Sequence, residues 1–277
     1  MCSLARAHRS TGPDGGEAHP RLACRPGGRR LSCPDRRRHL HAPAGARAAI
    51  RRYDVISFDC YGTLIDWDRG ITAAFESALV RTGARLDARQ VWRAYEEIEP
   101  VVEAEPFRPY REVLTESARR VADRLGWALH DGDAAFLARS VPNWTPFRDT
   151  NAALLRLHNA GYRLAILSNV DDDLLAWTRR HFAVPFEFTV TAQQVRSYKP
   201  GHRHFHAARE LVAGRRWLHA AQSYFHDVTP AADLGIPVAW INRGHHKATG
   251  KARPTRELHT MAELADWLAP HTDLLLP

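Results

Sequence analysis

Residues 53–64 read Y-D-V-I-S-F-D-C-Y-G-T-L, and this stretch decides the fold of the chain. Its first half is short, apolar and rich in β-branched and aromatic residues, which predicts a buried strand. The strand ends at Asp59, and the Gly-Thr turn behind it lets backbone N–H groups face the same small space. A carboxylate held there suits a nucleophile that faces an anionic substrate, although an aspartate at a strand end can also simply cap a turn.

The sequence on the C-terminal side of this strand predicts a helical insertion and then a parallel sheet. Apolar residues recur at helical spacing in residues 71–82, 87–103 and 110–126. Strands and helices then alternate, which favours an α/β fold with helices on both faces of a parallel sheet. We predict strands at 162–168, 186–190, just before Gln222 and at 238–241, and helices from Asp171, from His202 and over 261–268.

Polar residues follow several of the predicted strands. Asp59, the Ser168-Asn169 pair and the segment 222–227 each come directly after one of them. In parallel α/β sheets, reactive groups gather where the strands end at their carboxyl edge. We therefore expect one cleft to hold all three.

Charge and cysteines are unevenly distributed along the chain. Residues 1–50 contain ten Arg, no Lys and three acidic residues, whereas the remaining 227 residues carry 29 basic and 28 acidic groups. The N-terminal segment has no apolar period, so we expect a disordered basic extension and a nearly neutral folded part, which argues against nucleic-acid binding. No apolar stretch approaches a membrane span, and the N-terminus has no secretory pattern, so a cytoplasmic location is expected.

Four ordered motifs give the chain a family resemblance. After F-D-C-Y-G-T-L come L-A-I-L-S-N at 164–169, S-Y-K-P at 197–200 and Y-F-H-D-V-T-P-A at 224–231. Over residues 53 to 268 the chain resembles the haloacid dehalogenase superfamily. The resemblance implies a Rossmann-like core over 51–65 and 146–277, with an α-helical cap over 66–145.

Two positions indicate the branch of this superfamily. Its phosphatases carry a second aspartate two residues after the nucleophile and an acidic pair in the last motif, but Tyr61 and Gln222 occupy these positions, with only Asp227 remaining. Tyrosine is a poor acid near neutral pH, and an amide binds magnesium less well than a carboxylate does. Together with A-W-I-N-R at 239–243, the motifs resemble the type II (L-2-haloacid) dehalogenases, which need no metal or other cofactor.

The resemblance assigns roles to individual residues. Asp59 would displace halide from a 2-haloacid and form an ester, and Asp227 would activate the water that cleaves it. Lys199 would keep Asp59 ionised, since a nearby cation lowers a carboxylate pKa. As a loop lysine, it is expected to add little to stability. Thr63 would bond Asp59, while the substrate would contact Cys60, Tyr61, Ser168, Asn169 and the cap arginine, Arg93.

Several alternatives stay open from the sequence. Arg93 lies on an amphipathic helix and can equally be an ordinary surface residue. Phe205, Gln222 and Tyr224 replace a tyrosine, a serine and an asparagine of the dehalogenase pattern. The rivals of a dehalogenase are a phosphatase acting on a small phosphate ester and a non-catalytic binding protein. The helical cap also suggests a homodimer.

Overall fold

The core of the protein is a sheet of six parallel strands, arranged in the order β3-β2-β1-β4-β5-β6. The computed structural model describes residues 51–270. Strand β1 (Val55–Phe58) lies in the middle and pairs with β2 (Arg163–Ser168) on one side and β4 (Trp217–Ala221) on the other. The chain therefore builds the sheet outward in both directions from β1, which confirms the predicted Rossmann-like α/β fold.

The other core elements are the helix directly before β2, and the helices and strands that follow β2 and β4 along the chain. They are α5 (Thr150–Asn159), α6 (Asp172–Thr178), η2 (Arg179–His181), β3 (Phe188–Thr191), α7 (Ala192–Val195), α8 (Arg203–Val212), η3 (Tyr224–Val228), α9 (Thr229–Asp233), β5 (Val238–Ile241), β6 (Arg256–Leu258) and α10 (Met261–Leu268).

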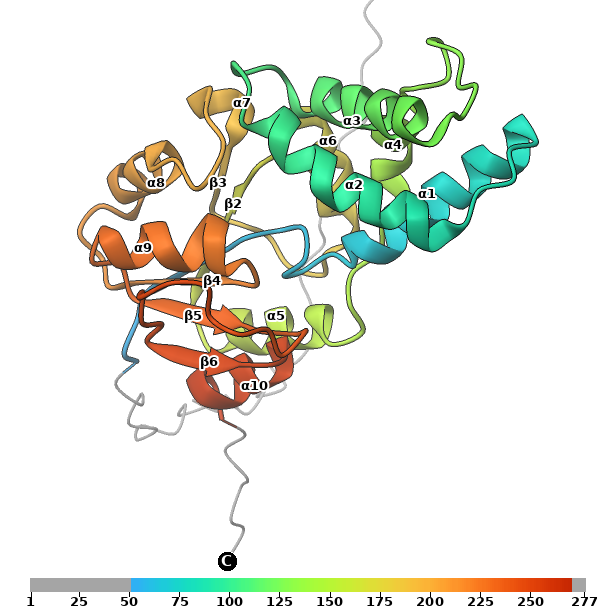
Figure 1. Cartoon of the computed structure of the whole chain (residues 1–277). Coiled ribbons are helices and arrows are strands. Elements are labelled where there is room, and N and C mark those ends of the chain that lie inside the picture. Colours follow the sequence, from blue (N-terminus) through green and yellow to red (C-terminus); the bar gives the residue numbers. More distant parts are fainter. Residues whose placement is uncertain (1–50, 271–277) are drawn as a thin grey trace, which may run out of the picture. The chain divides into compact units, whose positions relative to one another are not determined.

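Successive side chains of the strands enter two separate hydrophobic layers, as the pleat of a strand requires. Ile56 and Phe58 of β1 pack in the layer that contains residues of α5 and α10. Val55 points to the opposite layer, which contains residues of α8 and α9. Figure 1 shows α5 and α10 on one side of the sheet and α8 and α9 on the other. The sheet is thus covered on both faces, and its carboxyl edge is left for the site.

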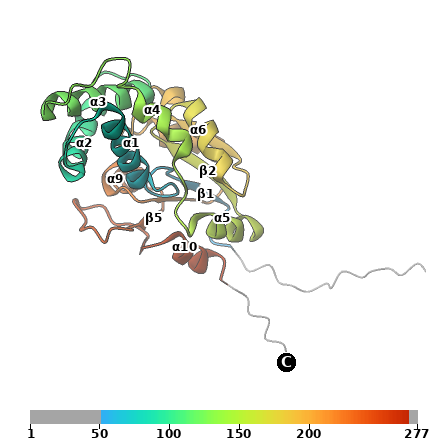
Figure 2. The same cartoon turned by 90° about the vertical axis from the view of Figure 1, so that its right-hand side faces the viewer.

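A group of helices is inserted between β1 and β2. These are α1 (Trp67–Thr82), α2 (Ala88–Glu103), α3 (Tyr110–Leu125), α4 (Phe136–Ser140) and η1 (Val141–Asn143). Figures 1 and 2 show α1 to α4 gathered at one end of the sheet. We call residues 66–145 the cap.

Two sets of hydrogen bonds tie the cap to the core. Where the chain enters and leaves the cap, Asp66 N–H donates to the Thr145 carbonyl and Phe147 N–H donates to the Leu64 carbonyl. Asp171, from the loop after β2, accepts the first two N–H groups of α3 at 2.7 and 3.0 Å. Because these α3 amides have no partner within their own helix, a core carboxylate satisfies them and fixes the cap above the strand ends.

The predicted elements agree with the structure, with a few additions. Sequence patterns missed α4, α5, α7, α9, β6, the π-helical turn η3 and the 3₁₀ turns η1 and η2; all of these except α5 are very short. None of the helices between residues 51 and 270 combines the length and hydrophobicity that crossing a bilayer requires. The expected disorder of residues 1–50 lies outside the described residues.

Candidate active site

A cavity of about 290 Å³ lies between the cap and the carboxyl ends of the strands. The order in which the chain adds strands reverses between β1 and β4, and ligands of open α/β sheets bind at such a switch point. Asp59 follows β1, Ser168 and Asn169 come at the end of β2, and Asp227 lies in η3 beyond β4. The structure thus brings these four residues together.

Asp59 is held by the turn that follows it. The hydroxyl of Thr63 donates to Asp59 Oδ2 at 2.8 Å and accepts the N–H of Gln222 at 2.8 Å. Gly62 has φ +89°, and a Cβ there would lie 2.9 Å from Trp67 Nε1, so glycine is required at this bend. Burial raises the pKa of Asp59, and the ammonium of Lys199 opposes that effect.

Lys199 lies at the centre of the charged groups. Its Nζ donates to Asp59 Oδ1 at 2.9 Å, to Asp227 Oδ1 at 2.6 Å and to the Leu167 carbonyl at 3.0 Å. The side chain is only 1 % exposed. The premise that Lys199 is a loop lysine with little packing is wrong, and we now expect its removal to lower stability, because it would leave two buried carboxylates without a counter-ion.

A buried chain of hydrogen bonds holds Asp227 from behind. Trp217 Nε1–H donates to Ser57 Oγ at 2.7 Å, and Ser57 Oγ is hydrogen-bonded to His219 Nδ1 at 2.8 Å. His219 Nε2–H then donates to Asp227 Oδ1 at 3.0 Å. His219 and Lys199 thus both bond Asp227 Oδ1. The buried Oδ2 of Asp227 has no hydrogen-bond partner within the described structure.

His219 was not identified from the sequence. The available signal was a histidine within the apolar run of β4, since a polar residue in a buried strand needs a partner. We expect His219→Leu to lower turnover roughly tenfold, because Asp227 loses a hydrogen bond that helps to keep it ionised and oriented. Presteady-state kinetics should place the loss in the water-dependent step. The control is His181→Leu, whose ring contacts the Pro142 carbonyl instead; an equal loss there would contradict a specific role for His219.

Ser168 and Asn169 both line the cavity. Ser168 Oγ is buried without a hydrogen-bond partner within residues 51–270, so its hydroxyl is free to bond a ligand. Asn169 Oδ1 accepts the backbone N–H of Lys199 at 2.8 Å, and Asn169 Nδ2 donates to Glu103 Oε1 at 3.0 Å.

The two residues after Asp59 differ in their surroundings. The Tyr61 ring lines the cavity, but its hydroxyl is hydrogen-bonded to Thr178 Oγ1 at 2.8 Å, and burial raises its pKa well above the ordinary value. Tyr61 is therefore unable to serve as a general acid near neutral pH. Cys60 is fully buried in the core and is not among the residues that line the cavity.

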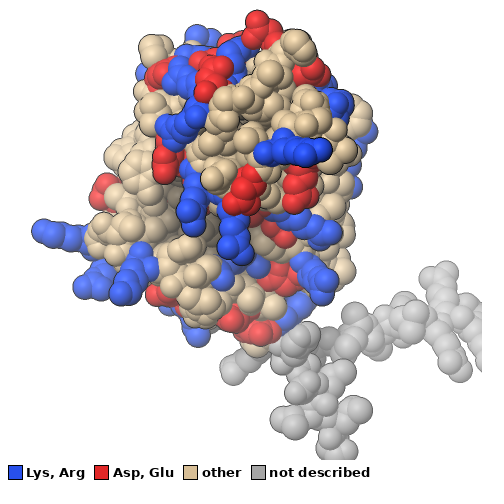
Figure 3. All heavy atoms as spheres, turned by 45° about the vertical axis from the view of Figure 1, so that its right-hand side comes forward, with Lys and Arg blue, Asp and Glu red and all other residues tan. Residues whose placement is uncertain are grey.

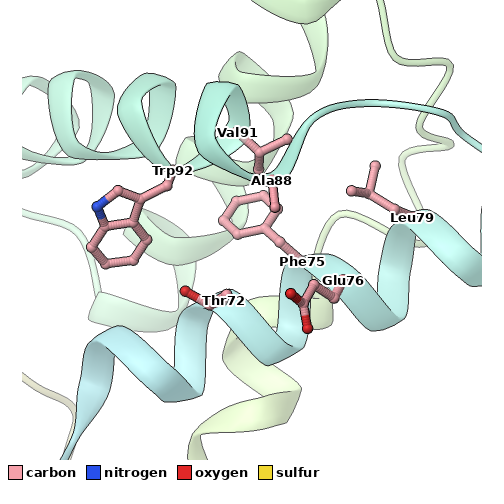
Figure 4. Close-up of a pocket in the computed structure, with 7 residues that line it drawn as sticks. All are labelled: Thr72, Phe75, Glu76, Leu79, Ala88, Val91 and Trp92. Atoms are coloured by element: carbon pink, nitrogen blue, oxygen red, sulfur yellow. The ribbon is translucent and has the colours of Figure 1, made fainter.

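Arg93 is exposed on α2 and does not line the cavity. Its neighbours Val91 and Trp92 line a separate small pocket between α1 and α2 (Figure 4), whose free volume of about 10 Å³ has room for little more than a water molecule. The expected halide contact of Arg93 is thus not supported by its position. Within the described residues, no arginine lines the cavity.

The cap instead contributes three glutamates to the cavity. Glu96, Glu99 and Glu103 of α2 line it opposite the strand ends. Tyr110 Oη–H donates to Glu99 Oε1 at 3.3 Å, and His226 Nε2 lies 3.6 Å from Glu103 Oε2. Burial raises the pKa of Glu99 to about 7 and that of Glu103 well above its ordinary value. In the sequence these residues resemble ordinary solvated glutamates of a helix.

The raised pKa of Glu99 predicts a pH-dependent stability difference. The ordinary value is 4.5, so the folded protein binds the Glu99 proton more tightly than the unfolded chain does. The stability that the folded protein gains from binding this proton is fully present below pH 4.5 and is lost as the pH rises through about 7. Glu99→Gln should therefore gain on the order of 2 kcal/mol over wild type between pH 5 and pH 8 in urea unfolding. Glu97→Gln, at an exposed position of α2, is the control, and parallel profiles for both variants would contradict the assignment.

The three departures from the dehalogenase pattern have different surroundings. Gln222 lines the cavity, and its backbone N–H holds Thr63. Tyr224 points away, and its hydroxyl donates to the Ala252 carbonyl at 2.7 Å. Phe205 is fully buried, with its ring edge-on to His219 at 5.3 Å. Of the three, only Gln222 can therefore contact a ligand in the cavity directly.

The molecular surface carries charges of both signs. Basic and acidic side chains are interspersed over the face that Figure 3 shows. Among residues 51–270, no group of three or more His, Cys, Asp and Glu side chains is arranged to hold a metal ion.

Comparison with known proteins identifies the family. Residues 53–219 match the family model of the haloacid dehalogenase-like hydrolases, and the chain belongs to this family. An (S)-2-haloacid dehalogenase, H-109, from Pseudomonas putida is 29% identical over 221 residues, covering 77% of this chain and 96% of that protein.

Solved structures share the fold. A defluorinating L-2-haloacid dehalogenase superposes with a TM-score of 0.69 at 21% identity, covering 78% of this chain and 95% of that one. An L-2-haloacid dehalogenase from Xanthobacter autotrophicus with chloropropionic acid covalently bound gives a TM-score of 0.65 at 17% identity, covering 77% and 97%.

Proposed function

We propose that this protein is a hydrolase that converts 2-haloalkanoic acids to 2-hydroxy acids through an ester on Asp59. The observation that carries the proposal is the position of Asp59 at the cavity, bonded to Lys199 and Thr63, with Asp227 bound to the same ammonium. The (S)-2-haloacid dehalogenases among its relatives support the substrate class.

The first step forms the ester. An oxygen of the Asp59 carboxylate attacks the carbon that carries the halogen, the new C–O bond forms, and halide leaves with the electron pair of the C–X bond. Ser168 Oγ, which has no partner among residues 51–270, is a donor for the substrate carboxylate. Asn169 Nδ2 donates to Glu103 Oε1 and to the Lys199 carbonyl, so it would have to release Glu103 to bond the departing halide. The covalently bound chloropropionic acid in the Xanthobacter autotrophicus enzyme is consistent with such an intermediate.

The second step cleaves the ester. Asp227 Oδ2, which has no hydrogen-bond partner among residues 51–270, takes a proton from water, and the hydroxide attacks the Asp59 carbonyl carbon. The bond between the Asp59 carbonyl carbon and the substrate oxygen then breaks, and the product oxygen takes the proton held by Asp227. Asp59 keeps one oxygen from water and releases the second proton of that water to solvent. Once the ester forms, Asp227 is the one carboxylate that still faces the Lys199 ammonium. The ammonium keeps Asp227 ionised.

Two residues, Tyr61 and Gln222, argue against the phosphatase alternative. Tyr61 stands where a phosphatase needs an acid, but its hydroxyl is bound to Thr178. Gln222 offers an amide where the metal-binding carboxylate would be. The cytoplasmic location and a homodimer formed through the cap stay predictions.

Isotope labelling tests the proposal. With enzyme in excess and one turnover of 2-chloropropanoate in heavy-oxygen water, the product should be largely unlabelled, while a peptide containing Asp59 gains the label. Label in the first product would mean direct attack by water and would overturn the ester. Release of phosphate from phosphate esters, but no halide from haloacids, would favour a phosphatase, whereas neither activity would favour a binding protein.

A further inference from the structure

The cap side of the cavity collects carboxyl groups and aromatic rings. Positions 96, 99 and 103 of α2 are spaced by three and four residues, which places the glutamates on one side of the helix. Trp67, Tyr95 and Tyr110 line the same cavity, and the Trp67 and Tyr95 rings are 6.5 Å apart. Carboxylates together with aromatic faces are the groups that bind organic cations.

Within residues 51–270, the three glutamates have no lysine or arginine partner, and His226 lies 3.6 Å from Glu103. Among the described residues, no lysine or arginine lies within 4.0 Å of a carboxylate of Glu96, Glu99 or Glu103. Five carboxyl groups line the cavity with a single lysine, Lys199, which already bonds Asp59 and Asp227. Glu99 and Glu103 are partly buried, and Glu96 is exposed. Partly buried carboxyl groups without a lysine or arginine partner at a ligand cavity are candidates for a functional role.

A second observation shows that the cavity is built for a polar ligand. Tyr95 is 1 % exposed and lines the cavity, yet its hydroxyl has no hydrogen-bond partner within residues 51–270. A buried hydroxyl without a partner costs about 1–3 kcal/mol, which a ligand that bonds it would recover. The Tyr95 oxygen can accept a hydrogen bond from an ammonium group beside Glu99.

We infer that the enzyme prefers 2-haloacids whose far end carries an alkylammonium group, received by Glu96, Glu99 and Glu103 against the rings of Trp67 and Tyr95. This inference rests on the proposed function. Ser168 and Asn169 would hold the carboxylate and halide at the strand ends, while the positive end of the substrate neutralises the cap. A haloacid without an amino group would place only an apolar carbon chain beside the same glutamates.

Binding of reaction products tests the preference without requiring turnover. Titration calorimetry at pH 8 would compare 6-amino-2-hydroxyhexanoate with 2-hydroxyhexanoate, and the corresponding four-carbon pair covers a shorter reach. We expect at least one amino compound to bind tenfold or more tightly than its uncharged counterpart. Equal or weaker binding of both amino compounds would overturn the inference.

Variants show whether the glutamates carry the preference. Glu99→Gln and Glu103→Gln should each reduce the amino-to-plain affinity ratio at least threefold, with little effect on the plain hydroxy acid. Two variants are used so that the test still stands if one of them fails to fold. Glu97→Gln is the control that should keep the wild-type ratio, because Glu97 is exposed on the same helix and pairs with Arg124. An unchanged ratio in folded Glu99→Gln and Glu103→Gln would overturn the inference.

Halide release separates the two proposals. The wild-type protein should dehalogenate the amino-substituted substrate, 6-amino-2-chlorohexanoate, with a higher specificity constant than 2-chlorohexanoate. Halide release from plain haloacids with no preference for amino compounds in rate or binding refutes the inference alone. A binding preference for amino compounds without halide release from any haloacid refutes the dehalogenase proposal and leaves the cationic subsite supported.

Discussion

Asp59→Asn is expected to reduce halide release by about 10⁴-fold or more, since an amide is a poor nucleophile and the ester is no longer formed. The folded state should change little, because asparagine keeps the size of the side chain and an oxygen that accepts the Thr63 hydroxyl. Burial already raises the pKa of Asp59, so removing its charge also relieves a desolvation cost.

A matched carboxylate of the same region gives the control for this substitution. Asp54 lies just before β1 and forms an ion pair with Arg216 at the surface. Asp54→Asn should retain nearly full turnover. Mass spectrometry of the wild-type protein quenched during turnover should find the substrate mass on the peptide that contains Asp59. If Asp59→Asn still releases halide at a tenth of the wild-type rate, the nucleophile lies elsewhere.

Lys199→Met should reduce both turnover and stability. Methionine fills the volume but leaves the Asp59 and Asp227 carboxylates close together and without a cation, so we expect a loss of about 3–5 kcal/mol in unfolding free energy. Turnover should fall at least a hundredfold in the protein that remains folded, because both carboxylates lose the charge that keeps them ionised.

The pH dependence of this variant distinguishes its causes. Without Lys199, protonation of either carboxylate relieves the repulsion, so the stability deficit should be larger at pH 8 than at pH 5 in urea unfolding. Lys247→Met, at an exposed position, should change neither stability nor rate. Wild-type turnover in Lys199→Met from pH 6 to pH 10 would refute the electrostatic support of Asp59.

The sequence by itself determined the fold class and the position of Asp59. An apolar run followed by a carboxylate and a Gly-Thr turn predicts a buried strand of a parallel sheet with the carboxylate at its end, because strand period and burial are local properties of the chain. The order of the motifs that contain Ser168, Lys199 and Asp227 predicted that they meet, since the carboxyl ends of parallel strands share an edge.

Tertiary structure alone decided what faces Asp59 across the cavity. Periodicity showed that α2 is amphipathic, but the direction in which Arg93 and Glu99 point depends on how α2 docks against α1 and the core. Arg93 and Glu99 lie about a third of a turn apart around the helix, so the face that α2 presents to the cavity decides which of them meets the substrate, and no local pattern fixes that face. The burial of Lys199 and the bond from His219 to Asp227 likewise depend on which strands and loops become neighbours, which only long-range packing determines.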